Sequence, residues 1–117
     1  MSQHNDTGRK GEALSLEFLK LSGFTILHTN WRHRHWEIDV IAERKGILHF
    51  IEVKTRTSEL YGFPEESITK KKMQYLMNAA TEFLFLNPQW VRIQYDALSV
   101  LMKDNDVEYF FIEDIFL

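Results

Sequence analysis

The chain has 117 residues, of which 44% are hydrophobic and 14% aromatic, and its formal net charge is −3. This length suits a single domain over residues 1–117 with its own hydrophobic core, and the composition excludes a disordered polypeptide. Cysteine is absent, which excludes disulfides and thiolate metal sites and fits a cytoplasmic protein. The apolar run from Phe83 to Leu86 is far too short to cross a membrane, so no membrane partner is expected.

The charges are distributed unevenly along the chain. Residues 1–72 hold 12 Lys/Arg and 10 Asp/Glu, whereas residues 73–117 hold 2 Lys/Arg and 7 Asp/Glu. The formal net charge of −3 argues against a simple basic nucleic-acid binder. The N-terminal part can still present a locally positive surface around a metal site.

The predicted elements are two helices and five strands. Thr7 or Asp6 can cap a first helix that continues to Leu21 and is ended by Gly23. The other predicted elements are a strand over Phe24 to His28, a charged connection over Trp31 to His35, strands over Trp36 to Ala42 and Gly46 to Arg56, a loop over Ser58 to Glu66, a helix from Ser67 or Thr69 to the residue before Asn87, and strands over Val91 to Ala97 and Val107 to Ile112. This order, αβββαββ, predicts an α/β sandwich with a central mixed sheet flanked by helices.

Two of these strands, joined by a turn at Lys45 and Gly46, carry charges in an apolar setting. The second is apolar on both faces, yet Glu52 and Lys54 lie two residues apart and share a side. With a two-residue turn, Asp39 stands opposite Glu52, with Cβ atoms about 4.5–5.5 Å apart. Two such carboxylates repel each other unless a cation such as Mg²⁺ or Mn²⁺ lies between them. Lys54 could then orient or help deprotonate a water, or stabilise charge on a phosphate.

An ordinary solvated ion pair is the alternative interpretation of Glu52 and Lys54, since most surface pairs contribute little. The apolar faces of the strand and the acid at matching register argue against it. On the first helix, Glu12 extends the apolar face of Leu16 and Leu19 and could join the acids. A helix-start acid favoured by the macrodipole is the simpler explanation of Glu12 alone.

The acids and the lysine match a known pattern. Glu12, then Glu37-Ile38-Asp39, then Glu52-Val53-Lys54-Thr55-Arg56, resembles the PD-(D/E)xK nuclease signature. More closely, the chain resembles the YraN family of endonuclease-like proteins, distant relatives of archaeal Holliday junction resolvases. Further matches are Gly8 to Ala13, Asn30 to Arg32, Gly62 with Pro64, Lys72 with Leu76, Ala79-Ala80 and Tyr95-Asp96.

The resemblance implies a restriction-endonuclease-like fold and hydrolysis of phosphodiester bonds in DNA with Mg²⁺ or Mn²⁺ as cofactor. It also implies a preference for branched or junction DNA. By the same resemblance, Asp39 and Glu52 bind the metal and the backbone carbonyl of Val53 completes its shell. Lys54 is then the catalytic lysine, and Glu12 is the acid contributed by the helix.

Several basic residues are candidates for nucleic-acid contact. The two arginines of the charged connection lie between Trp31 and Trp36, so they could contact phosphate while an aromatic ring stacks on a base. A solvated loop with both tryptophans anchored in the core is an equal alternative. The third arginine, Arg56, extends from the strand that carries Glu52 and Lys54, and Lys72 matches the family pattern. The candidates are therefore Arg32, Arg34, Arg56 and Lys72.

The sequence leaves three functions open. The first is a metal-dependent DNA endonuclease, for which a homodimer would supply one site per strand. The second is a non-catalytic nucleic-acid-binding module that keeps the nuclease fold. The net negative charge favours this second hypothesis, as does Trp36, where many relatives have a glycine and where its side chain could narrow access to the site. A structural or interaction protein is the third.

Overall fold

The described part of the chain folds into five strands and two helices in the predicted order. This computed structural model describes residues 3–57 and 68–115, with side chains from residue 8 onward, so the predicted loop over residues 58–66 lies outside the described residues. The elements are α1 (Gln3–Leu21), β1 (Thr25–His33), β2 (Trp36–Arg44), β3 (Ile47–Arg56), α2 (Lys70–Leu86), β4 (Ile93–Lys103) and β5 (Asp106–Ile112). Neither described helix is long and apolar enough to span a membrane.

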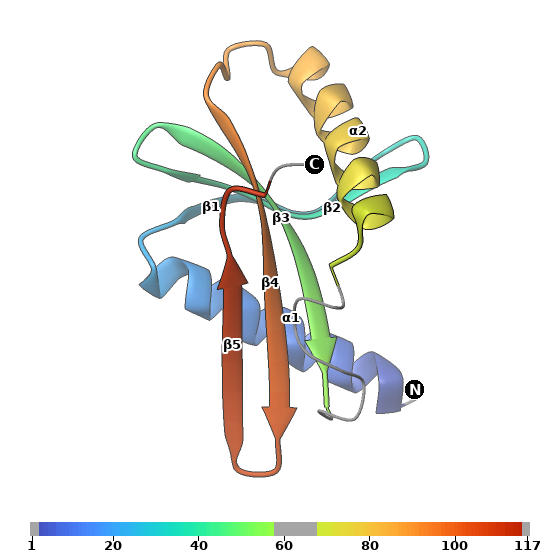
Figure 1. The fold of residues 1–117 in the computed structure, drawn as a ribbon, viewed down its shortest axis with the longest axis vertical. Coiled ribbons are helices and arrows are strands. Elements are labelled where there is room, and N and C mark those ends of the chain that lie inside the picture. The colour runs from blue at the N-terminus through green and yellow to red at the C-terminus, as the bar shows by residue number, and fades with distance from the viewer. Residues whose placement is uncertain (1–2, 58–67, 116–117) are drawn as a thin grey trace.

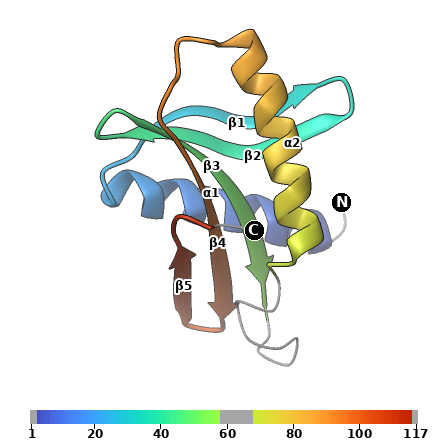
Figure 2. The same ribbon diagram turned by 45° about the horizontal axis from the view of Figure 1, so that its top comes forward.

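All described strands belong to one mixed sheet in the order β1-β2-β3-β4-β5. The β3–β4 pair is parallel and the other three pairs are antiparallel. A parallel pair needs a crossover connection, and α2 lies in that connection. Figures 1 and 2 show α1 along one face of the sheet and α2 across the other. The predicted α/β sandwich with a central mixed sheet is therefore confirmed.

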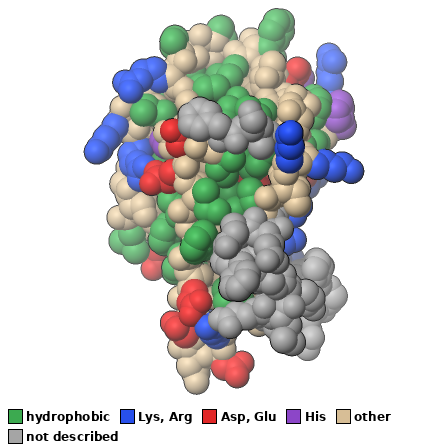
Figure 3. Space-filling model, viewed as in Figure 1, with side chains coloured by type: hydrophobic (Ala, Val, Ile, Leu, Met, Phe, Trp, Pro, Cys, Tyr) green, Lys and Arg blue, Asp and Glu red, His purple; other side chains and the backbone are tan. Residues whose placement is uncertain are grey.

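Each helix packs on its own hydrophobic core. On one face, α2 contributes Met73, Leu76, Ala79, Ala80 and Phe83, which pack on Ile38, Ile41, Leu48 and Phe50. On the other, Leu19 of α1 packs with Phe24, Val40, Ala42, Ile51, Leu98 and Val100. Because both faces are covered, β2 and β3 have the nearly continuous apolar sequence of buried strands. In Figure 3, hydrophobic side chains gather down the middle of the visible face, and Lys and Arg side chains stand at its edges.

The turn between β2 and β3 fixes the register of the central hairpin. Lys45 and Gly46 both have positive φ, 54° and 79°, as a two-residue turn of type I′ requires. Arg44 consequently faces Ile47, and the regular pairing continues to Val40 opposite Ile51. The predicted register is confirmed over this stretch. Asp39 and Glu52 occupy the next position on each strand.

Several element boundaries differ from those predicted. The predicted charged connection is wrong in its first half, because β1 continues to His33 and forms a hairpin with β2. Trp31 packs edge-on against Phe83 of α2, and His33 Nε2 lies 3.2 Å from Glu82 Oε1. Alternate residues of the polar stretch are therefore anchored on α2, which the local sequence does not reveal. In addition, α1 begins at Gln3 and β4 continues to Lys103.

Glycine at position 11 allows α1 to approach β3 closely. A Cβ added there would lie 2.9 Å from Thr55 Cβ and still closer to the outer atoms of that side chain. We expect Gly11→Ala to destabilise the protein by about 1–3 kcal/mol, as overpacking does. Gly8→Ala on the same helix meets no atom within 4 Å and should stabilise it by about 0.5–1 kcal/mol through helix propensity. Urea unfolding measures both, and equal effects at the two positions would contradict the close approach.

Candidate functional site

The candidate site forms where the regular pairing of β2 and β3 ends. Beyond Val40 and Ile51, the side chain of Asp39 reaches across to the backbone of β3. Its Oδ2 accepts a hydrogen bond of 2.8 Å from the Val53 backbone N–H. This bond takes the place of a strand-to-strand bond and fixes the orientation of the Asp39 carboxylate. The predicted ligand Asp39 is thus held by the backbone N–H of Val53, the residue whose carbonyl is also a predicted ligand.

The two predicted metal ligands line one cavity. Its volume is about 480 Å³, and it lies between the β2–β3 hairpin and the first turns of α2. The hairpin contributes Asp39 and Glu52 to its wall, together with a third acid, Glu37. The helix end contributes Thr69, Lys71, Lys72 and Tyr75. Residues more than 30 positions apart along the chain therefore meet at this point, as Figure 2 shows for the elements that carry them.

Burial and neighbouring carboxylates raise the pKa of both acids. The pKa of Glu52 is raised to about 7, first by its burial and then by the Asp39 carboxylate, against the lowering effect of Lys72 and Lys54. The pKa of Asp39 is also raised, mainly by burial; the bond from Val53 opposes this shift, and the nearby Glu37 carboxylate adds to it. The lysines thus compensate the negative charge only in part, as expected of a site that binds a cation.

The raised pKa of Glu52 makes the stability of the metal-free protein depend on pH. The folded protein holds the Glu52 proton more tightly than the unfolded chain does, because the pKa is about 7 instead of 4.5. The stabilisation is therefore fully present below the unfolded pKa and is lost as the pH rises through the folded pKa. We expect the melting temperature in EDTA to fall between pH 5 and pH 8.

Glu52→Gln should flatten this dependence, since glutamine carries no titrating proton. Glu17→Gln changes an exposed acid of α1 and should leave the dependence as in the wild type. Thermal melts of the three proteins across the pH range measure the effect. A wild-type melting temperature that rises from pH 5 to pH 8 would contradict the raised pKa.

A second, smaller cavity lies on the α1 side of Asp39. It measures about 150 Å³, and its wall includes Glu12, Asn30 and Asp39. Glu12 Oε1 accepts a 2.7 Å hydrogen bond from Asn30 Nδ2, and Asn30 has a φ of 50°, a conformation that asparagine tolerates better than most residues. The Glu12 carboxylate also contributes to the raised pKa of Asp39. The structure thus places the helix acid beside Asp39, as the sequence analysis expected.

The two lysines lie differently with respect to the acids. Lys54 is exposed, and its ammonium lowers the pKa of Glu52, but Lys54 is not part of the wall of the larger cavity. Lys72 is half-buried in that wall and lowers the pKa of both Asp39 and Glu52. Lys72 was predicted to contact nucleic acid through the family pattern alone, since nothing in its local sequence brings it to the acids.

The arginines predicted to contact nucleic acid fall into two groups. Arg32 and Arg34 are exposed on the β1–β2 hairpin, and Arg32 Nη2 lies 3.4 Å from Glu37 Oε1. Arg56 is only 6% exposed, so contact with a phosphate would require a movement that uncovers it. The two tryptophans of the hairpin pack against the α2-side core, which favours the interpretation of Trp31 and Trp36 as anchors.

Tyr75 also belongs to this site, although the sequence did not indicate it. Its hydroxyl donates to the carbonyl of His35 at 3.0 Å and accepts from the backbone N–H of Glu37 at 3.1 Å. The ring lies 5.1 Å from that of Trp36. Tyr75 therefore fastens α2 to the start of β2, beside the acids. Its position on the exposed side of a helical pattern gives no indication of this role.

The described side chains offer two carboxylates for a metal ion but no larger set. No group of three or more His, Asp or Glu side chains within the described ranges is arranged to hold a metal. Mg²⁺ is commonly bound through one or two carboxylates and keeps several waters. Asp39 and Glu52, with raised pKa values and a shared cavity, fit that mode of binding. The Val53 carbonyl is the further candidate ligand.

Fold and site together define a two-helix α/β sandwich protein with a carboxylate pair at the end of its central hairpin pairing. Comparison with known proteins gives its family. The model of "uncharacterised protein family UPF0102" matches residues 11–100, a range that contains the candidate site, and the chain belongs to this family. This is the family that the YraN resemblance indicated.

Relatives match the chain over most of their length. A UPF0102 protein of Flavobacterium psychrophilum is 39% identical over 116 residues, which cover 99% of this chain and 98% of the relative. One from Chlorobaculum parvum is 43% identical over 100 residues, covering 85% and 78%. One from Chloroherpeton thalassium is 37% identical over 118 residues, covering 93% and 92%. These names state no activity, so a function has to be inferred from the site.

Proposed function

We propose that the protein is a metal-dependent endonuclease that hydrolyses phosphodiester bonds in DNA, with Mg²⁺ or Mn²⁺ as its cofactor. The observation that carries the proposal is the pair of acids, Asp39 and Glu52, in one cavity with incompletely compensated charge. A partly buried acid pair of this kind costs stability unless it is paired or binds a cation. The PD-(D/E)xK resemblance of the same residues supports the assignment.

In this proposal Asp39, Glu52 and the Val53 carbonyl hold the metal. When bound, it would polarise a phosphate oxygen and lower the pKa of an attacking water. The Val53 N–H keeps the Asp39 carboxylate in place. Lys54, the catalytic lysine by resemblance, stabilises the negative charge that develops on the phosphate. Glu12 adds negative charge on the far side of Asp39.

Basic residues around the cavity would hold the nucleic-acid backbone. Lys72 lies in the cavity wall, and Arg32 and Arg34 are exposed on the neighbouring hairpin. Arg56 would join them only after a movement that exposes it. DNA is proposed over RNA, and branched or junction DNA over simple duplex, because of the YraN resemblance. A homodimer would present two such sites to the two strands of a substrate.

Cleavage assays test the proposal directly. The purified protein is incubated with labelled junction, flap, linear duplex and single-stranded DNA in Mg²⁺, in Mn²⁺ and in EDTA. We expect products with either metal and none in EDTA. Cleavage that persists in EDTA, or the absence of products from every substrate with both metals, would contradict the proposal.

A non-catalytic nucleic-acid-binding module is the second candidate. The exposure of Lys54 outside the wall of the acid-lined cavity favours it, since a catalytic lysine has to reach the phosphate. Such a module should gain little thermal stability from Mg²⁺ or Mn²⁺. Removing a negative charge with Asp39→Asn should then leave its DNA affinity unchanged or raise it. The endonuclease should instead gain stability from the metals, by an amount that grows with their concentration.

A further inference from the structure

Tyr75 is held rigidly at the edge of the acid-lined cavity. Its hydroxyl hydrogen-bonds two backbone groups of β2 and the preceding turn, at 3.0 and 3.1 Å. Trp36 lies against the ring with a centroid separation of 5.1 Å, and His35 lies 4.2 Å from Trp36 in turn. Figures 1 and 2 both show the β1–β2 hairpin beside α2. The ring is thus fixed at its hydroxyl end and supported by a second aromatic ring.

This fixed ring is still partly open to solvent. Tyr75 is 39% exposed and lines the cavity together with Asp39 and Glu52. Trp36 packs against the α2-side core and is not part of the cavity wall. Of the two rings, Tyr75 is therefore the one that a bound molecule can reach. A rigid aromatic surface loses little conformational entropy when a planar group stacks on it.

The other walls of the cavity match the rest of a nucleotide. Its volume of about 480 Å³ lies within the range of small-molecule binding sites. Lys71 and Lys72 carry the positive charge that a phosphate requires, and Tyr75 offers the apolar plane that a base requires. We infer that Tyr75 stacks on an unpaired nucleobase next to the scissile phosphate. This inference rests on the proposed function, because it names the substrate class of the same site.

The stacking surface restricts the form of the substrate. A base inside a duplex is covered on both faces by its neighbours, so it reaches an aromatic ring only after leaving the stack. Single strands, flaps and the open centre of a junction present such bases without that unstacking energy. The substrate is accordingly a strand with at least one unpaired nucleotide beside the cut, and fully paired duplex is the poor substrate.

Binding of a fluorescent base tests the inference apart from cleavage. The probe is a single-stranded DNA 12-mer carrying one 2-aminopurine, titrated in Ca²⁺ so that it stays intact. Stacking on Tyr75 should quench the fluorescence. Tyr75→Leu should weaken binding about tenfold and remove most of the quenching, because one base–aromatic stack is lost. The same oligonucleotide in a fully paired duplex should bind more weakly than the single strand.

Two further variants separate stacking from a structural role. Tyr75→Phe keeps the ring and loses both hydroxyl hydrogen bonds, so it should bind within about twofold of wild type if stacking dominates. Phe85→Leu removes an exposed aromatic ring of the same helix, 81% exposed and outside the cavity wall, and should have no effect. If Tyr75→Leu does not fold, Tyr75→Met replaces it.

The outcomes distinguish this inference from the proposed function. Ring-dependent quenching without cleavage of any substrate in Mg²⁺ or Mn²⁺ would support base stacking on Tyr75 and contradict the endonuclease. Cleavage of paired duplex as fast as that of single-stranded DNA, by wild type and Tyr75→Leu alike, would support the endonuclease and overturn the inference. Loss of binding in Tyr75→Phe as large as in Tyr75→Leu would also overturn it, because the hydroxyl bonds would then be what matters.

Discussion

Asp39→Asn is expected to slow metal-dependent DNA cleavage by at least about a hundredfold, since even residues that only support a metal ligand contribute 10–100-fold. The same change should leave the metal-free protein at least as stable as wild type. Asparagine still offers an oxygen to the Val53 N–H, which donates to Asp39 at 2.8 Å. It also removes a charge that lies near Glu52, Glu37 and Glu12. Loss of activity with retained stability is characteristic of a functional acid.

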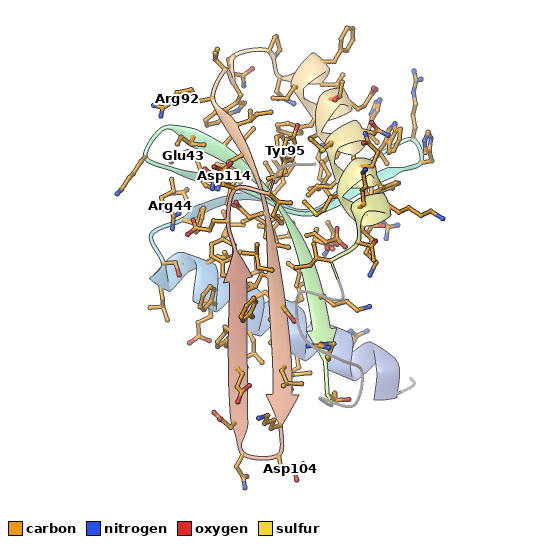
Figure 4. The ribbon with its side chains drawn as sticks, in the orientation of Figure 1. Glu43, Arg44, Arg92, Tyr95, Asp104 and Asp114 are labelled. Atoms are coloured by element: carbon orange, nitrogen blue, oxygen red, sulfur yellow. The ribbon has the colours of Figure 1, made fainter. Side chains whose placement is uncertain are left out.

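The measurement combines initial cleavage rates with thermal melts in EDTA and in Mn²⁺. Wild type should melt at a higher temperature in Mn²⁺ than in EDTA, and Asp39→Asn should lose that difference. Asp104→Asn is the control, because Asp104 is exposed at the β4–β5 turn, far from the cavity (Figure 4). An Asp39→Asn protein that cuts as fast as wild type would remove Asp39 from the site.

Asp96→Ala is expected to lower the free energy of unfolding by about 3–5 kcal/mol, more than any other substitution proposed for this protein. Removal of one partner of a buried pair has an effect of this size. Asp96 is fully buried, and its Oδ2 lies 2.6 Å from Nδ1 of the equally buried His49 on β3. Its Oδ1 accepts from the Gln94 side chain at 3.0 Å and from the Asp114 backbone at 2.9 Å. One carboxylate thus joins β3, β4 and the segment after β5.

Alanine at this position would leave the His49 ring nitrogen, the Gln94 side-chain amide and the Asp114 backbone N–H without their partner, the first of them in the buried core. The described segment after β5, residues 113–115, would also lose one backbone attachment and keep the 2.8 Å bond from Ile115 N–H to the Tyr95 carbonyl. Figure 4 shows Tyr95 and Asp114 at this end of the strands. Urea unfolding at constant pH measures the effect, with exposed Asp106→Ala as control. A loss below about 1 kcal/mol, the range of an ordinary hydrogen bond, would contradict this account.

The central hairpin could be predicted from the sequence because local chemistry determines it. Lys45-Gly46 favours a two-residue turn, and that turn fixes the pairing as far as Val40 and Ile51. Asp39 and Glu52 come directly after the last pair of this register. The α2 boundaries were predictable for a similar reason, since the Thr69 side chain accepts from the Lys72 N–H and caps the helix.

Contacts between distant segments were the part that the sequence did not reveal. Tyr75 and Lys72 reach the cavity because α2 crosses the hairpin, and helical periodicity says nothing about what an exposed helix residue faces. The burial of Arg56 likewise depends on tertiary packing, although its strand position suggested an outward contact. The second half of β4 was missed because Ala97 through Leu101 are buried and do not alternate between polar and apolar residues.

A crystal soaked in Mn²⁺ tests the central claim most directly, because anomalous scattering locates the ion without any assumption about activity. The account predicts a peak between the carboxylates of Asp39 and Glu52, within ligand distance of both, and the loss of that peak in Asp39→Asn crystals. Occupied Mn²⁺ positions elsewhere with none between these two side chains would contradict the metal site and the function built on it.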